Sequence, residues 1–365
     1  MKHATAITAA FVTLTAASSQ VSAAGRDHIE IVGSSTVYPF ATVVAETFGN
    51  KTKFKTPKIE STGSGGGFKL FCAGNGIKTP DITNASRRIK KSEFDKCAKN
   101  GVNSITEVQI GYDGIAIANA KEGPQFNLSL RDVFLALAKE VPGTEPGQLK
   151  PNPYKTWKDV NPALPAVKIE VLGPPPTSGT RDAFAELAME GGCKTFGWIK
   201  DLKAASKKAK KAGDKDKAKA LKQQYKGICH TVREDGAYIE AGENDNLIVQ
   251  KLEKNPNALG IFGFSFLDQN GDKVKGAQVD GVEISFDNIA DGKYPVSRPL
   301  FFYVKNDHVG KVPGIKEYIV EFTEEDTWGP DGYLTEKGLI PLGDEQRAQM
   351  AKDARALKPL KLGNE

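Results

Sequence analysis

Apolar stretches alternate with small polar turns along the chain, and the same local pattern occurs three times. Each copy is an apolar, strand-like run, then a turn rich in Ser, Thr and Gly, then a segment whose apolar residues recur at helical spacing. The strand-like runs are 28–32, 58–61 and 167–172, and their turns are 33–36, 62–67 and 173–180. This succession predicts an α/β fold in which a ligand binds at the carboxyl ends of the strands.

Two longer apolar stretches, 108–118 and 258–266, are predicted to be strands that carry the chain between two lobes. Lobe I then comprises residues 24–112 and 262–365, and lobe II comprises residues 113–261. A chain of 365 residues with 39% hydrophobic residues has enough apolar material for two such cores. The same composition excludes an intrinsically disordered chain.

The first 23 residues have the pattern of a secretory signal peptide. Lys2 gives a basic start, 4–17 is an uncharged run, and small residues at 21–24 form a cleavage site. The run is too short and too rich in Thr and Ser for a membrane span, and no Cys follows the cleavage site to carry a lipid. We therefore expect an exported, soluble protein of the periplasm without a lipid anchor.

Four cysteines in an exported chain predict two structural disulfides. They are Cys72, Cys97, Cys193 and Cys229. Three pairings are possible, and the pairing of sequence neighbours keeps each bridge within one region of the chain. No CxxC pair or histidine cluster accompanies them, so we expect neither a metal site nor a cofactor.

Positive charge is concentrated in one segment. Residues 200–226 hold eleven Lys against three Asp, a net charge of +8, whereas the formal charge of the whole chain is +5. Helix-forming composition with little apolar content predicts a solvated helical hairpin broken near Gly213. A nucleic-acid-binding arm is the alternative, but Arg is absent from the segment and Tyr225 is its one aromatic residue, so we expect no nucleic-acid partner.

The three turns supply what an oxyanion needs: hydroxyl groups, backbone N–H groups at helix starts, and glycines that permit close approach. Ser and Thr are also ordinary helix N-caps, so one such turn carries little weight, but three in one chain favour anion binding. The spacing in 63–69 fits neither nucleotide-binding loop. Arg87 and Arg181 are candidates for a guanidinium partner of the anion. Asp182 either accepts a hydrogen bond from an anion that still carries a proton, such as phosphate, or only complements its helix start.

Four motifs follow one another in the chain: GSSTVYP at 33–39, STGSGGG at 61–67, NASR at 84–87 and TSGTRDAF at 177–184. Together with 242–246 and 257–263, they resemble the periplasmic phosphate-binding proteins of ABC-type phosphate importers. The resemblance extends over nearly the whole mature chain. It implies a type II periplasmic-binding-protein fold, in which two α/β lobes joined by crossover strands close on one phosphate.

The resemblance also implies a set of phosphate ligands. These are Ser35, Thr36 and Val37 (through its backbone), Ser64, Gly65, Ser86, Arg87, Ser178, Gly179 and Thr180, with Arg181 and Asp182 beside them. Some family members have Asp directly after Ala-Ser, where this chain has Arg87, so Asp182 is expected to be the carboxylate, with Asp113 in reserve. Those members also have an Arg upstream of Ser-Gly-Thr, and 173–176 offers none, so Arg87, assisted by Arg181, is expected to supply the guanidinium.

The segment 200–226 has no counterpart in the matched motifs and is interpreted as an insertion stapled by Cys193 and Cys229.

We expect a monomeric receptor that binds inorganic phosphate without changing it and delivers it to the membrane permease subunits of an ABC importer. One alternative is a receptor for sulfate, molybdate or a phosphonate. Another is a secreted phosphatase or serine hydrolase with Ser64 or Ser178 as nucleophile, and a third is an adhesion role for the Lys-rich segment.

Overall fold

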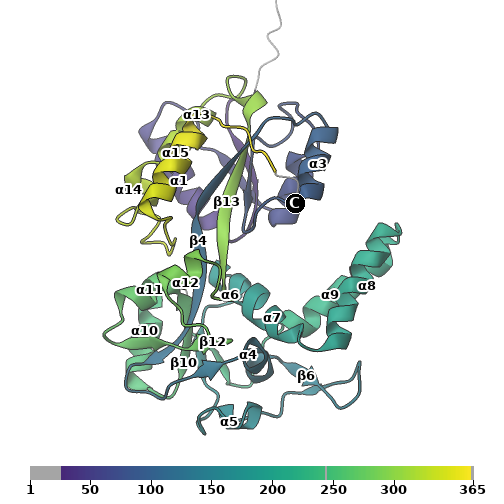
Figure 1. Ribbon diagram of the computed structural model, residues 1–365, viewed down its shortest axis with the longest axis vertical. Helices are drawn as coiled ribbons and strands as arrows, with labels where there is room; N and C mark the ends of the chain where they lie inside the picture. Colours follow the sequence, from purple (N-terminus) through teal and green to yellow (C-terminus); the bar gives the residue numbers. More distant parts are fainter. Residues whose placement is uncertain (1–25, 243–244, 363–365) are drawn as a thin grey trace, which may run out of the picture.

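The computed structural model describes residues 26–242 and 245–362. In this part of the chain, two α/β lobes lie one above the other and are connected by the long strands β4 (Ile105–Ala120) and β13 (Ser297–Lys305) (Figure 1). The expected signal peptide, 1–23, lies outside the described residues. Within 26–242 and 245–362, no helix is long and apolar enough to cross a membrane.

One sheet runs through both lobes in the order β2-β1-β3-β13-β4-β10-β8-β9, and β11 also pairs with β4. Its lobe I strands, which are parallel to one another, are β1 (Glu30–Gly33), β2 (Lys58–Ser61) and β3 (Ile82–Ala85). Its remaining strands are β8 (Val171–Gly173), β9 (Tyr238–Glu240), β10 (Leu259–Gly263) and β11 (Val274–Gly276). Two small sheets pair β5 (Asn127–Leu128) with β12 (Gln278–Val279), and β6 (Glu140–Pro142) with β7 (Leu149–Pro151).

Helices cover the sheet in both lobes (Figure 1). In lobe I they are α1 (Tyr38–Lys51), α2 (Ser64–Phe71), α3 (Lys91–Lys99), α13 (Ile315–Phe322), α14 (Glu325–Trp328) and α15 (Asp344–Arg355). In lobe II they are α4 (Leu130–Leu137), α5 (Trp157–Val160), α6 (Gly179–Phe184), α7 (Glu190–Cys193), α8 (Gly197–Lys211), α9 (Lys215–His230), α10 (Asp245–Lys254), α11 (Phe264–Gln269) and α12 (Phe286–Ala290). A π-helical turn at Ala185–Met189 makes α6 and α7 one continuous helical run.

The three predicted strand–turn–helix units are present. The first turn feeds α1, which buries Ala41, Val44 and Phe48 at the helical spacing seen in the sequence. The second turn feeds α2 and the third feeds α6. The third strand is shorter than predicted, because β8 begins at Val171 rather than at Val167.

The predicted lobe boundary near residue 262 is wrong. The sequence predicts that 258–266 returns the chain to lobe I, but its strand β10 pairs with β4 and β8 inside lobe II. Side chains that follow it, from Phe264 to Val296, are buried in the lobe II core. The strand that returns the chain to lobe I is β13. The sequence does not distinguish the two strands, because an apolar run has the same pattern whether it crosses between lobes or is buried within one.

A third segment also passes between the two cores. Tyr112 on β4 and Ile340 exchange two backbone hydrogen bonds, of 2.8 and 3.0 Å. Leu339 belongs to the lobe I core, whereas Ile340 and Leu342 belong to the lobe II core. The lobes are therefore joined by β4, β13 and the segment around Ile340.

The Lys-rich segment forms the predicted helical hairpin, which we call the lysine arm and define as residues 197–230. Its two helices are α8 and α9, and the break between them contains Gly213 at φ +85°. The arm projects from lobe II on the same side of the molecule as α3 (Figure 1). Ser206 Oγ on α8 donates a hydrogen bond to Ala218 O on α9, and a disulfide closes the base of the hairpin.

Two disulfides join the cysteines as sequence neighbours. Cys72 pairs with Cys97, which fastens the end of α2 to α3, and Cys193 pairs with Cys229 at the base of the arm. All four side chains are fully buried. This settles the pairing that the sequence left open.

Removing the arm disulfide is expected to destabilise the protein. The bridge closes a loop of 36 residues, and the chain-entropy argument assigns such a cross-link about 3 to 4 kcal/mol. Chemical denaturation of Cys193→Ala/Cys229→Ala should show that loss in the free energy of unfolding. Lys210→Gln, on the exposed surface of the arm, is the control and should change it by less than about 0.5 kcal/mol. A loss below about 1 kcal/mol in the double variant would contradict the assignment of a structural staple.

Candidate functional site

The carboxyl ends of three parallel strands in lobe I form one edge. The Ser34 N–H donates to Asn84 O, and the Thr62 N–H donates to Gly33 O, each over 2.9 Å. Gly33 has φ +136°, and a Cβ there would lie 2.1 Å from Asn84 O, so the close approach of these segments requires glycine. The first, second and third motifs therefore lie side by side, as strand-end geometry predicts.

Ser64 and Ser86 are joined at this edge. Their hydroxyl oxygens are 3.2 Å apart, and the Ser86 N–H donates to Ser64 Oγ over 3.0 Å. Gly65 follows on the exposed surface. Val37, at the N-cap of α1, is fully buried.

A cavity of about 290 Å³ lies where lobe I faces lobe II. It is lined by Thr36, Pro39, Phe40, Asp113, Ser178, Gly179, Thr180, Asp245, Phe266, Glu336 and Lys337. Thr36 comes from the first motif and Ser178–Thr180 from the fourth. A Cβ on Gly179 would lie 3.9 Å from Ser35 O, so the two motifs approach each other across the cavity.

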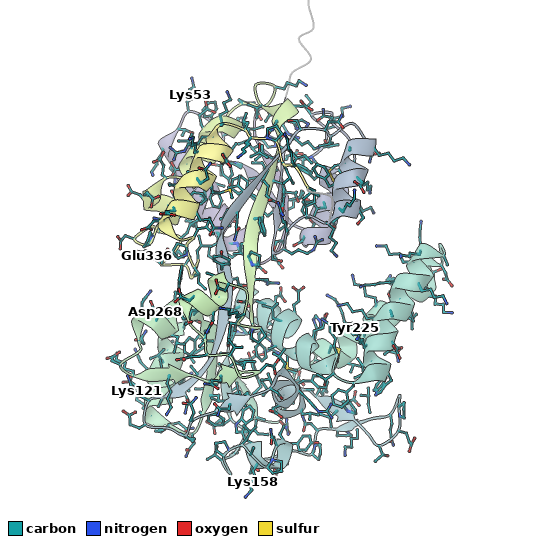
Figure 2. All side chains as sticks on the ribbon, in the orientation of Figure 1. Lys53, Lys121, Lys158, Tyr225, Asp268 and Glu336 are labelled. Atoms are coloured by element: carbon teal, nitrogen blue, oxygen red, sulfur yellow. A yellow bond between two sulfur atoms is a disulfide. The ribbon has the colours of Figure 1, made fainter. Side chains whose placement is uncertain are left out.

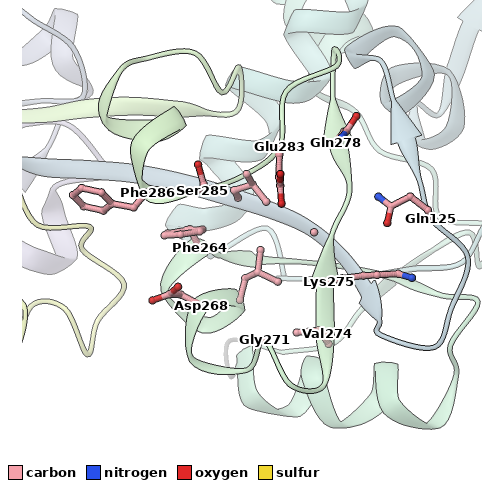
Figure 3. A pocket seen from close by; sticks show the side chains of 13 residues that line it. Gln125, Phe264, Asp268, Gly271, Val274, Lys275, Gln278, Glu283, Ser285 and Phe286 are labelled. Carbon is pink, nitrogen blue, oxygen red and sulfur yellow. The ribbon is translucent and has the colours of Figure 1, made fainter.

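Two other cavities in the described residues contain few or none of the expected site residues. The pocket in Figure 3, of about 450 Å³, lies in lobe II between Phe264, Lys275 and Phe286. It contains no expected site residue. A pocket of about 420 Å³ holds Arg181, His230 and Arg233 but none of the hydroxyl motifs. The candidate site is therefore the inter-lobe cavity.

Arg298 is a further functional candidate that the sequence reasoning missed. It lies on β13 directly opposite Asp113 on β4, and its side chain is 8% exposed. Its Nε donates to Asp113 Oδ2 over 3.2 Å, and its Nη1 donates to Glu186 Oε2 over 2.8 Å. Its Nη2 donates to Thr36 Oγ1. One guanidinium thus contacts lobe I, a crossover strand and lobe II beside the cavity.

The sequence contained a signal for this residue. Arg298 is the single charge at the start of the apolar stretch 297–304, where a purely structural strand has no need of a cation. The prediction that 258–266 returns the chain to lobe I leaves 297–304 without a role as a crossover strand. The missed arginine therefore follows from the misplaced lobe boundary.

Asp113 is the acidic partner of this guanidinium. Burial raises the pKa of Asp113 above its ordinary value, the Arg298 guanidinium opposes the rise, and the Glu186 carboxylate adds to it. The Asp113 side chain is 14% exposed and lines the cavity. Of the two carboxylates that the sequence offered as candidates, the reserve one, Asp113, lines the cavity, together with Asp245 and Glu336.

Three charged candidates lie elsewhere. Arg87 forms a bidentate pair with Glu93, at 2.9 and 2.8 Å, and its guanidinium lies 5.4 Å from the Phe68 ring. The Arg181 guanidinium stacks 4.2 Å from the Tyr238 ring, away from the inter-lobe cavity. Asp182 is exposed and does not line the cavity. Adjacent positions on one helix point in different directions, which explains why Arg181 and Asp182 do not follow Gly179 and Thr180 into the site.

No group of three or more His, Cys, Asp or Glu residues within 26–242 and 245–362 is arranged to hold a metal ion. The hydroxyls of Thr36, Ser178 and Thr180, a buried guanidinium and a carboxylate are instead groups that bind a partly protonated oxyanion through hydrogen bonds.

Two α/β lobes joined by crossover strands, with a polar cavity between them, define the class of two-lobed binding proteins. The profile of the PBP superfamily domain matches residues 18–326. The phosphate-binding protein PstS of Staphylococcus haemolyticus is 30% identical over 299 residues, which cover 80% of this chain and 75% of that protein. Protein SphX of Synechococcus elongatus is 28% identical over 330 residues, covering 88% and 80%. The chain therefore belongs to the PBP superfamily and, within it, to the family of the phosphate-binding protein PstS.

Solved structures agree in fold. A possible phosphate-binding protein from Planctomyces limnophilus has a TM-score of 0.68 at 24% identity, covering 91% of this chain and 98% of that one. An ABC-type phosphate transport receptor from Vibrio cholerae has a TM-score of 0.52 at 20% identity, covering 86% and 100%. The family and fold expected from the four motifs are thus confirmed, and this is a family of substrate-binding receptors rather than of enzymes.

Replacing Arg298 is expected to raise the pKa of Asp113 further. Arg298→Met removes the cation that opposes the effect of burial, so the carboxyl should release its proton at a higher pH than in the unmodified protein. A carbon-13 NMR titration of the side-chain carboxyl measures this shift. Arg87→Met removes an equal charge that pairs with Glu93 instead and should leave the pKa of Asp113 in place. An unchanged or lower pKa in Arg298→Met would contradict the pairing.

Proposed function

We propose that this chain is the substrate-binding receptor of an ABC phosphate importer, which captures inorganic phosphate between its lobes and delivers it to the permease subunits. The observation that carries the proposal is the inter-lobe cavity, where Thr36 and Ser178–Thr180 lie beside the Arg298–Asp113 pair. The relatives named phosphate-binding protein PstS support the choice of ligand.

The hydroxyls and helix starts would supply most of the hydrogen bonds to the anion. Thr36, Ser178 and Thr180 carry hydroxyls in the cavity lining. Gly179 begins the continuous helical run 179–193, whose first backbone N–H groups favour an anion. We assign Ser35 and the backbone of Val37 to the same shell. Ser64, Gly65 and Ser86, on the same edge of lobe I, would complete it as the lobes close.

Arg298 would supply the guanidinium in place of Arg87 and Arg181, which already have partners outside the cavity. Asp113 would accept a hydrogen bond from a protonated phosphate oxygen. A carboxylate beside an anion is unfavourable unless that anion carries a proton, as phosphate does near neutral pH and sulfate does not. The Arg298–Asp113 pair would therefore both bind phosphate and favour it over sulfate.

Closure is the proposed mechanism. The ligand would contact groups from both lobes, so it would stabilise the closed arrangement by its differential contacts. β4, β13 and the segment around Ile340 connect the lobes, and small changes in their backbone angles would move one lobe relative to the other.

We propose that no bond is made or broken. A serine nucleophile needs a positioned base, and the three histidines of the described residues are engaged elsewhere: His28 contacts Asp27, His230 contacts Glu190, and His308 contacts Asp81. The two disulfides support a location outside the cytoplasm, in the periplasm. We propose that the receptor acts as a monomer without a nucleic-acid partner.

Phosphate titration with sulfate competition tests the function directly. Calorimetry should show one phosphate bound per chain, with sulfate a weak competitor. Asp113→Asn is expected to reduce the preference for phosphate over sulfate about tenfold or more, because the proton acceptor is lost and one buried charge-assisted hydrogen bond is worth about 1.5 to 3 kcal/mol. Asp182→Asn is the matched control and should retain the preference. Absence of phosphate binding, or equal binding of sulfate by the unmodified protein, would overturn the proposal.

The guanidinium assignment has its own test. Arg298→Met should weaken phosphate binding by about 30- to 100-fold, the size expected for a charge-assisted hydrogen bond in a buried site. Arg298→Lys should recover only part of the loss, since Lys lacks the planar fork of donors. Arg87→Met is the control with the same change of charge, and a larger loss there than in Arg298→Met would transfer the role to Arg87. Circular dichroism checks that each variant is folded.

A further inference from the structure

The lysine arm holds the positive charge of the molecule. Residues 200–226 carry a net charge of +8, whereas the rest of the chain after residue 23 carries −4. Ten of the eleven lysines in this segment are exposed. An anion that approaches the body meets net negative charge, and an anion that approaches the arm meets strong positive charge.

One row of these lysines runs the length of α9. Lys215, Lys219, Lys222 and Lys226 follow the spacing i, i+4, i+7, i+11, which places them on one face of the helix. Like charges at this spacing repel each other and destabilise a helix. The row therefore does not serve the stability of the arm, and its regularity needs another explanation.

Helix α9 packs against the π-helical turn 185–189, which continues directly from α6. Partial desolvation and the Glu186 carboxylate raise the pKa of Asp182, and Lys226 is the first of the cations that oppose the rise, followed by Arg298. Asp182 belongs to α6, the helix whose first residues line the cavity. Lys226 thus acts electrostatically on the helix that forms part of the site.

The other helix of the arm acts on lobe I. Arg87 and desolvation lower the pKa of Lys90, and Lys207 and Lys203 on α8 lower it further. Lys90 is the N-cap of α3, and α3 and the arm lie on the same side of the molecule in Figure 1. Lys90 on lobe I and the arm residues Lys203 and Lys207 are therefore close enough to influence one another electrostatically.

The arm is held in place at its base. Glu190 accepts hydrogen bonds from His230, over 2.9 Å, and from Lys203, and its carboxylate lies 2.7 Å from the Lys194 ammonium. Burial alone would raise the pKa of Glu190, but hydrogen bonds from His230, Lys194 and Lys203 outweigh it and hold the pKa well below its ordinary value. With the Cys193–Cys229 disulfide, this network fixes the direction in which the lysine row points.

We propose that the lysine arm is an electrostatic collector that draws phosphate toward the inter-lobe cavity and raises its rate of entry. The inference rests on the proposed function. Fixed charges accelerate association of an oppositely charged ligand, and the acceleration falls as salt shortens the screening length to about 8 Å at 0.15 M. Lysine suits this role, because it is a compact point charge that attracts an anion without the planar, two-point grip of arginine.

The test compares two triple variants of the full chain that remove the same charge. Lys215→Gln/Lys219→Gln/Lys222→Gln neutralises the row on the arm. Lys53→Gln/Lys121→Gln/Lys158→Gln neutralises three exposed lysines on other parts of the molecule, as Figure 2 shows. Calorimetry gives the Kd for inorganic phosphate, a rapid-mixing chase of radiolabelled phosphate gives koff, and their ratio gives kon.

We expect the arm variant to lower kon about 3- to 10-fold near 10 mM salt, with koff within twofold of the unmodified protein. The difference should fall below about twofold at 0.5 M salt, where screening removes long-range attraction. The control variant should change kon less than twofold at either salt concentration. An unchanged kon in the arm variant, an equal fall in the control, or a change confined to koff would overturn the collector. Absence of phosphate binding by the unmodified protein would instead overturn the proposed function.

Discussion

The antiparallel pairing of β4 with β13 is the contact on which the rest of the structure depends. The two strands are in register from Ser297 opposite Gly114 to Lys305 opposite Ile105, with one irregularity at Leu300 and Phe301. Both strands begin in one core and end in the other, so they join the lobes and define where the cavity lies. Because Arg298 and Asp113 are direct partners in this register, the pairing also brings a cation and a carboxylate to that cavity.

Burying the Arg298 guanidinium carries a desolvation penalty, and its hydrogen-bond partners offset that penalty. Asp113 and Glu186 provide negative charge, and Thr36 Oγ1 accepts a third hydrogen bond. The Glu186 side chain is 51% exposed, so it is the partner most readily exchanged for an incoming anion. Such an exchange would keep the guanidinium paired throughout and would leave Asp113 to accept a hydrogen bond from the ligand.

Charge is distributed unevenly between the site and its surroundings. The cavity lining combines one lysine, Lys337, with three carboxylates, Asp113, Asp245 and Glu336, so capture there depends on short-range hydrogen bonds from hydroxyl, backbone and guanidinium donors. Long-range attraction resides instead in the lysine arm, outside the lining. Separating the two allows the cavity to select by proton and hydrogen-bond pattern, while the arm acts on any anion through its charge alone.

The sequence by itself determined the α/β class, the three turns that precede α1, α2 and α6, the helical hairpin of the lysine arm and the family. Each of these depends on residues that are neighbours in the chain: helical spacing, glycines at strand ends, or motifs of four to eight residues.

Only the tertiary structure decided which strand returns to lobe I and which charged residues reach the cavity. A buried apolar run has no local mark that separates β10 from β13, and Arg298 meets Asp113, 185 positions away, only through strand pairing. Arg87, Arg181 and Asp182 lie within the expected motifs, but side-chain direction and competing partners such as Glu93 and Tyr238 turn the two arginines elsewhere. Long-range pairing and side-chain direction are set by how the elements pack, and that is the physical reason why the motifs predict hydroxyl and glycine residues of the candidate site but not Arg298.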